Sequence, residues 1–215
     1  IMFYSQQNED KIILEKYINQ NHNNDGTFLE LGALDGIKFS NTYYFEKNLN
    51  FSGVLIEANP NDYIKLKNNR KKCECFNAAI TDEKIDYIDF GVPNSCASEQ
   101  GGIVKTHRVK DSIKNTFKVK TMRLDNILNQ YNITYLDFIS LDVEGGELEV
   151  LKTLNFNLPI YLMCIELDNN NPTKDIECRE ILKKMNLDFD YKFGNNEFWI
   201  NKNYYRKNLL FKHIQ

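Results

Sequence analysis

Two glycines and two acids share the stretch "FLELGALDG", and their spacing suits a ligand-binding turn. Gly32 and Gly36 allow the backbone to approach a ligand closely, while Glu30 and Asp35 bring two carboxylates to the same turn. Phosphate-binding loops use backbone N–H groups and a helix N-terminus, and nearby carboxylates would repel the phosphate. The chain lacks both G-x-G-x-x-G and G-x-x-x-x-G-K. The turn therefore predicts a ligand without phosphate groups.

A third acid, Glu57, ends the apolar run "GVLIE". It follows Gly36 at the distance of about 20 residues that places an acid on a ribose diol in the next strand. Further on, Ala78 and Ala79 in "NAAI" offer the small residues that an adenine slot needs. S-adenosylmethionine has an ammonium, a sulfonium, a ribose diol and an adenine but no phosphate, so these residues predict it as the cofactor. Taken alone, "ELGALDG" is equally typical of an ordinary strand-to-helix turn.

Acids also follow two later apolar runs. Asp142 ends "YLDFISLD", where we expect it to act as the general base that removes a proton from an acceptor hydroxyl, and Glu144 follows on the turn. Glu166 and Asp168 end "IYLMCIELD", so with Asp142 they predict an oxygen-ligand site for Mg²⁺. A polar cleft without metal is the alternative for this group. For Asp142 and Glu144 the alternative role is to favour the N-terminus of the following helix through its dipole.

A histidine in the middle of the chain is a second candidate base. His107 lies in the segment 91–118, which is polar, contains glycines and is weakly periodic. This segment is predicted to be a variable loop that closes over the site as a substrate lid, or else a surface excursion. An imidazole that titrates near neutral pH would suit proton transfer, although a single loop histidine is often merely solvated.

Strand-like apolar runs alternate with amphipathic helices along most of the chain, after an N-terminal helical segment within residues 1–25. This alternation predicts an α/β fold with a mostly parallel sheet covered by helices on both faces. Near the end, "LDFDYKF" and "EFWINKN" are joined through "GNN", which predicts an antiparallel hairpin at one edge. Residues 1–215 show no domain linker, so we expect a single domain.

The net charge of −3 and a pI near 5.7 provide no positive field for nucleic acid or an anionic membrane. No apolar run approaches the roughly 20 residues that span a bilayer. The five cysteines are odd in number and scattered, which favours reduced thiols. We therefore expect a cytoplasmic protein that acts on a small molecule or glycan, without a nucleic-acid or membrane partner, while its oligomeric state is left open.

Six blocks in order resemble the FkbM family of S-adenosylmethionine-dependent methyltransferases: "SQQNED", "FLELGALDG" with "SNTYYFEK", "GVLIEANP", "NAAI", "TMRLDNIL" and "LDFISLDVEGGELEVLKTL". The resemblance implies a class I methyltransferase (Rossmann-like) fold with a seven-stranded sheet, and O-methylation of a hydroxyl on a sugar or a sugar-bearing molecule. The cofactor residues that it implies are Glu30, Gly32, Asp35, Gly36, Ser40, Asn41, Glu57, Ala78, Ala79 and Asp142.

Two other functions remain alternatives to this one. A nicotinamide-dependent oxidoreductase can use a similar sheet, although the missing G-x-G-x-x-G and the acids in its place argue against it. A non-catalytic module that retains the cofactor pocket is the second alternative, and the presence of Glu30, Glu57 and Asp142 argues against such decay.

Overall fold

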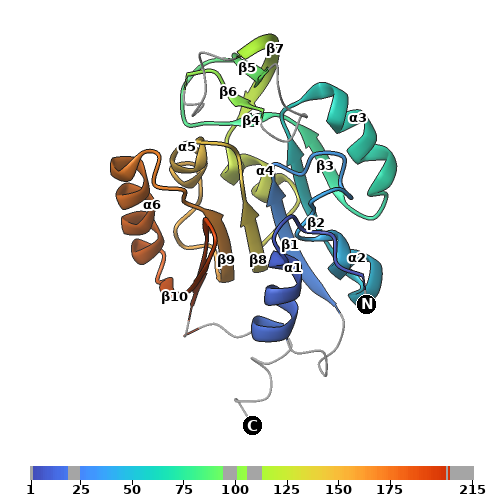
Figure 1. The fold of residues 1–215 in the computed structure, drawn as a ribbon, viewed down its shortest axis with the longest axis vertical. Coiled ribbons are helices and arrows are strands. Elements are labelled where there is room, and N and C mark those ends of the chain that lie inside the picture. The colour runs from blue at the N-terminus through green and yellow to red at the C-terminus, as the bar shows by residue number, and fades with distance from the viewer. Residues whose placement is uncertain (1, 19–24, 94–100, 106–112, 202, 204–215) are drawn as a thin grey trace.

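The computed structural model describes residues 2–18, 25–93, 101–105, 113–201 and 203. A seven-stranded sheet with the order β10-β11-β9-β8-β1-β2-β3 forms its centre (Figure 1). The strands are β1 (Gly26–Leu31), β2 (Phe51–Glu57), β3 (Glu74–Asn77), β8 (Leu136–Leu141), β9 (Ile160–Glu166), β10 (Asp188–Phe193) and β11 (Asn196–Ile200).

The central strands are parallel, as their continuous apolar runs predict. Strand β1 pairs with β2 on one side and with β8 on the other, and β8 pairs with β9. Every residue of β8 is buried, which is typical of a parallel strand covered on both faces. The chain order reverses between β1 and β8, and ligands of open α/β sheets bind at the carboxyl ends of the strands at such a point.

The hairpin expected at the end of the chain is present. Strands β10 and β11 are antiparallel and close through the turn at Gly194 and Asn195. Strand β11 also pairs antiparallel with β9, which puts this turn at the same edge of the sheet as the carboxyl end of β9.

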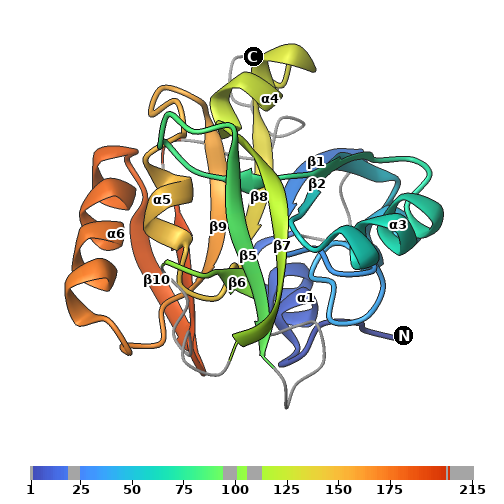
Figure 2. The same ribbon diagram turned by 90° about the horizontal axis from the view of Figure 1, so that it is seen from above.

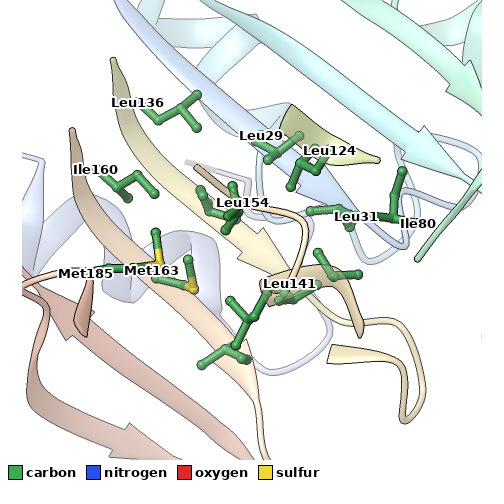
Figure 3. Packing of buried hydrophobic residues seen from close by; sticks show 14 of the residues in the cluster. Leu29, Leu31, Ile80, Leu124, Leu136, Leu141, Leu154, Ile160, Met163 and Met185 are labelled. Carbon is green, nitrogen blue, oxygen red and sulfur yellow. The ribbon is translucent and has the colours of Figure 1, made fainter. Parts of the chain in front are cut away.

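Helices cover both faces of the large sheet, in agreement with the predicted class I fold. One hydrophobic cluster joins the π-helix η1, α2 and α3 to Phe28 and Phe138, and the other joins α4, α5 and α6 to Leu29, Leu31 and Leu141 (Figure 3). No helix of the described residues is long and apolar enough to cross a membrane. The helices are α1 (Glu9–Ile12), η1 (Ile13–Tyr17), α2 (Tyr43–Leu49), α3 (Pro60–Asn69), α4 (Leu124–Gln130), α5 (Glu147–Leu151) and α6 (Pro172–Lys184).

The N-terminal helical segment is shorter than its pattern suggested, because a polar turn precedes it. Asp10 accepts hydrogen bonds from the backbone N–H of Tyr4 and from the hydroxyl of Ser5, at 2.6 Å each. These bonds fold residues 4–8 back onto the start of α1. The segment therefore carries Gln6 and Gln7 to the carboxyl edge of the sheet before the helix begins.

A second, smaller sheet contains both ends of the segment 91–118, which was expected to be irregular. Its order is β4-β7-β5-β6, with β4 (Ala79–Ile80), β5 (Tyr87–Pro93), β6 (Gly102–Ile103) and β7 (Ile113–Met122). Strands β5 and β7 pair over their length and extend across the large sheet when the molecule is seen from above (Figure 2). The prediction was wrong for these ends because long-range pairing stabilises β7, although its alternation of Phe117 and Val119 with lysines has the period of a strand.

Candidate active site

A row of polar residues crosses the large sheet where its strands end. Glu166 at the end of β9 lies opposite Asn196 of β11, and Glu57 at the end of β2 lies opposite Asn77 of β3. Between them, Asp142 directly follows β8, and its backbone N–H donates to the carbonyl of Leu31 at 3.3 Å. Five strands of the sheet, β11, β9, β8, β2 and β3, thus present carboxylates or amides along one edge.

A cavity of about 310 Å³ lies along this edge. The large sheet, the N-terminal segment, the hairpin turn and the small sheet all contribute to its wall. Of the described residues that line it, six are acidic and none is lysine, arginine or histidine. The acids are Glu9, Glu30, Glu57, Asp142, Glu144 and Glu166.

Gly32 is required where β1 approaches β8. Its φ is +80°, which L side chains rarely adopt, and a Cβ at this position would collide with the backbone carbonyl of Asp142. Gly32 therefore lines the cavity with bare backbone. Gly36 also has a positive φ, but a Cβ there would meet Arg70 and Leu66, so this glycine serves packing behind the turn.

Glu30 is almost fully buried and anchors the turn that leads into α2. Its carboxylate accepts hydrogen bonds from the Ser40 hydroxyl at 2.9 Å, the Asn41 backbone N–H at 2.7 Å and the Thr42 hydroxyl at 2.6 Å. Burial raises the pKa of Glu30, and the guanidinium of Arg70 opposes this effect. Glu30 thereby fixes the position of Asn41, which lines the cavity, while Ser40 lies behind it.

Arg70 is the partner that sequence reasoning did not find. It is completely buried, forms an ion pair with Glu46 and lies 3.7 Å from Glu30. Its guanidinium also donates to the Gly36 carbonyl at 3.0 Å. A single arginine at the end of α3 thus compensates two buried acids behind the glycine turn.

The Asn41 side chain leaves one polar atom available inside the cavity. Its Nδ2 donates to the Ser140 hydroxyl at 2.8 Å, whereas its Oδ1 is buried and has no hydrogen-bond partner within the described part of the chain. Unpaired buried acceptors are uncommon, and at a cavity wall they indicate a missing donor from a ligand.

Glu57 lies at the opposite end of the row, next to Ala78 and Ala79. Its carboxylate accepts from the backbone N–H of Leu34 at 2.8 Å and of Asn59 at 2.7 Å. Burial raises the pKa of Glu57 to about 7. Two backbone donors orient the carboxylate, and its remaining lone pairs can accept bonds from a diol.

Asp142, Glu144 and Glu166 form a compact acidic group. One carboxylate oxygen from each lies within 4.8 Å of the others. Burial, together with the neighbouring Glu166 and Glu144, raises the pKa of Asp142 well above its usual range. Its Oδ1 is buried and makes no hydrogen bond to any residue that the structure describes. Such a carboxyl is a stronger base than an exposed aspartate once it is ionised.

The structure corrects the membership of the predicted metal group. Asp142 and Glu166 belong to it, but Glu144 takes the place of Asp168. Strand β9 ends at Glu166, and the carboxylate of Asp168 accepts from the backbone N–H of Asn170 at 3.0 Å instead. Asp168 therefore stabilises the turn into α6.

Comparison with known proteins identifies the family of the chain. The model of the methyltransferase FkbM domain matches residues 30–193, which is most of the chain. The chain belongs to the FkbM methyltransferase family. It is thus an S-adenosylmethionine-dependent methyltransferase, as the six sequence blocks predicted. The comparison with curated proteins found no match.

Solved structures share the fold of this FkbM protein at low sequence identity. Fibrillarin from Aeropyrum pernix, in complex with natively bound S-adenosyl-L-methionine, has a TM-score of 0.50 and 10% identity over 91% of this chain and 74% of its own. A TehB-like methyltransferase from Corynebacterium glutamicum has a TM-score of 0.47 and 9% identity over 92% and 89%. A precorrin-6y C5,15-methyltransferase from Geobacter metallireducens has a TM-score of 0.46 and 10% identity, over 89% of this chain and 85% of its own.

In this FkbM protein Glu144 adopts a left-handed backbone conformation, with a φ of 56°. Glu147 holds the turn, since its carboxylate accepts from the N–H of Gly145 at 3.0 Å and from Lys174 at 2.5 Å. A positive φ at a non-glycine residue costs free energy and persists where the surrounding structure enforces it. Glu147 thus holds the turn that precedes α5, and Glu144 lines the cavity.

A further predicted residue, Asp35, is absent from the cavity lining. Asp35 accepts from the backbone N–H of Ile37 at 2.9 Å and of Lys38 at 2.8 Å, so its carboxylate closes the turn after Gly32. His107 lies outside the described residues, as does half of the predicted lid, residues 94–100 and 106–112.

The N-terminal segment contributes cavity residues that were not predicted. Gln6, Gln7 and Glu9 line the cavity, and Glu9 bonds to Asn196 of the hairpin. The block "SQQNED" was part of the family resemblance, and the conjunction of amides and an acid in it was the available signal.

Proposed function

We propose that this FkbM methyltransferase O-methylates a hydroxyl of a sugar, a glycan or a sugar-bearing small molecule. The observation that carries the proposal is Asp142, which directly follows β8 and is half-buried, with a raised pKa and a buried carboxylate oxygen that bonds to no described residue. Alcohol oxygens are poor nucleophiles while protonated, so their methylation needs a base within hydrogen-bond reach.

The residues along the strand ends fit the cofactor. S-adenosylmethionine, when bound, supplies a methyl group on a sulfonium that is already a good leaving group. Glu57 would accept from the ribose diol, and the small side chains of Ala78 and Ala79 would leave room for the adenine. The bare backbone of Gly32 and the Oδ1 of Asn41 face the remaining part of the cavity. The acidic lining matches a cofactor without phosphates.

Asp142 would take the proton of the acceptor hydroxyl, whose oxygen would receive the methyl group that the cofactor supplies. Burial raises the pKa of Asp142, and the neighbouring Glu166 carboxylate raises it further. A positive charge placed beside this pair favours the ionised form, so the base is prepared when the cavity is filled. The remaining task of the wall is to hold the acceptor in line and to exclude water.

A Mg²⁺ ion is the other way to compensate the acidic group. Three carboxylate oxygens are the ligand type that Mg²⁺ prefers, and Asp142, Glu144 and Glu166 offer them together. In that case the group would orient a substrate diol. Methyl transfer that persists in excess EDTA would exclude a role for the metal. Loss of activity in EDTA that only added Mg²⁺ restores would establish that role.

Two measurements test the proposed function. Calorimetry with S-adenosylhomocysteine should show binding at one site per chain, and a screen of sugars and glycans should show methyl uptake from labelled cofactor at oxygen. Methylation of nitrogen or carbon acceptors alone would contradict O-methylation. Binding of NADH in place of S-adenosylhomocysteine would support the oxidoreductase alternative, and cofactor binding without any single-turnover transfer would support the non-catalytic module.

A further inference from the structure

The end of the cavity farthest from Glu57 is built by two segments that meet. The backbone N–H of Gln7 and the Nδ2 of Asn196 each donate to the Glu9 carboxylate at 2.8 Å. A Cβ on Gly194 would touch the side-chain oxygen of Gln7, so the two segments are in contact at a second point. We call this set the rim; it consists of Gln6, Gln7, Glu9, Asn195 and Asn196.

The rim lies across the sheet from the nucleoside end. Strands β9, β8 and β1 separate β11 from β2, and at the usual spacing this is roughly 19 Å. Asp142 and Glu166 end the strands in between. A cofactor whose ribose reaches Glu57 would therefore leave the rim, on the far side of the base, to a second molecule.

Glu9 is a charged residue with little exposure that faces this space. Only 3% of its surface is exposed, yet it lines the cavity. Burial raises the pKa of the Cys164 thiol, and the carboxylates of Glu9, Asp142 and Glu30 add to this effect. The two hydrogen bonds that Glu9 accepts fix its orientation and leave lone pairs for a further donor.

The charge of the wall limits what this end accepts. The described lining is entirely acidic or neutral, and carboxylates in a partly desolvated cavity repel an anion strongly. Side-chain amides and carboxylates together suit molecules with several O–H or N–H donors. Asn41 adds an acceptor, Oδ1, that has no partner within the described residues although the side chain is about nine-tenths buried.

We propose that the rim is the acceptor subsite. Glu9 positions the acceptor by accepting a hydrogen bond from an O–H or N–H group next to the reacting hydroxyl. The rim accepts neutral or amino sugars but not phosphorylated or carboxylated ones. This deepens the proposed function and rests on it. Glu9 acts here as a positioning residue, while Asp142 remains the base.

Methyl uptake from labelled S-adenosylmethionine tests the charge rule. The probes are methyl glycosides of matched stereochemistry that are neutral, amino-bearing, uronic or 6-phosphorylated. Transfer to neutral or amino members, with at least tenfold lower kcat/KM for the anionic ones, is expected. Equal or better transfer to an anionic member overturns the proposal, as does the absence of transfer to every sugar. Calorimetry with S-adenosylhomocysteine separates the two failures, because retained binding leaves the cofactor part of the proposed function intact.

Glu9→Gln tests the positioning role, with Glu15→Gln as the matched control. Glu15 is exposed on the adjoining π-helix and is absent from the cavity wall. Loss of a charge-assisted hydrogen bond should raise the acceptor KM of Glu9→Gln about tenfold or more, with kcat reduced far less. S-adenosylhomocysteine affinity and Tm should stay near those of the parent, and Glu15→Gln should match the parent throughout. The positioning role of Glu9 is overturned if Glu9→Gln lowers cofactor affinity, Tm and kcat together. It is also overturned if the acceptor KM of this variant is unchanged.

Discussion

Asp142 and Glu166 end adjacent parallel strands and interact through a hydrogen bond between their carboxyl groups. The pair is half-buried beside the reversal point of the sheet, where neither acid can lose its proton without increasing the charge on a site that already contains Glu144. Burial and the adjacency of the two strand ends therefore give the proposed base, Asp142, a raised pKa.

Asp142→Asn should separate catalysis from binding. The amide keeps the size of the side chain but cannot take the acceptor proton, so kcat should fall by roughly 10²- to 10⁴-fold. Because the change also removes a like charge, Tm should not fall. Kinetics and calorimetry with S-adenosylhomocysteine check both points. An unchanged rate would move the base to His107.

Glu57→Gln should weaken cofactor binding. Replacing a carboxylate that accepts from a diol removes about 1.5 to 3 kcal/mol, which corresponds to a roughly 10- to 100-fold larger Kd for S-adenosylhomocysteine. Glu177→Gln on α6 is the control, since Glu177 is exposed and lies outside the cavity lining. Equal affinities for the two variants would exclude Glu57 from the cofactor site.

The raised pKa of Glu57 has a consequence for stability. Its pKa is about 7 in the folded protein against an ordinary 4.5, so the folded state binds the proton more tightly than the unfolded state. The contribution of Glu57 to the free energy of unfolding is therefore constant below pH 4.5. As the pH rises from 4.5 to 7, this contribution becomes less favourable to the folded state by on the order of 3 kcal/mol. Urea unfolding at pH 5 and pH 8 should show a smaller loss of stability over this range in Glu57→Gln than in the parent. Identical losses would show that Glu57 titrates normally.

Arg70→Met should destabilise the fold strongly. Removing the guanidinium leaves Glu30 and Glu46 buried without their compensating charge, which costs about 3 to 5 kcal/mol. Lys71→Met changes the neighbouring exposed lysine and should alter the unfolding free energy by less than about 0.5 kcal/mol. A denaturation midpoint for Arg70→Met close to that of Lys71→Met would contradict the role of Arg70.

The sequence by itself determined the strands of the large sheet and the acids at their ends. Apolar runs such as those of β1 and β8 indicate buried parallel strands because their periodicity is local, and Glu57, Asp142 and Glu166 follow from their place after such runs. The turn at Gly194 was equally local. The ordered blocks identified the FkbM family before any coordinate was considered.

Only the tertiary structure decided which of these acids lie together and what compensates them. Glu30 of β1 is held by Arg70, which directly follows α3. Glu144 rather than Asp168 joins Asp142, since the turn after β8 places the backbone of Glu144 in a left-handed conformation. Glu9 and Asn196 meet although 187 positions separate them. Hydrogen bonds and charges act over a few ångströms in space, and local pattern carries no record of which distant residues the fold brings within that distance.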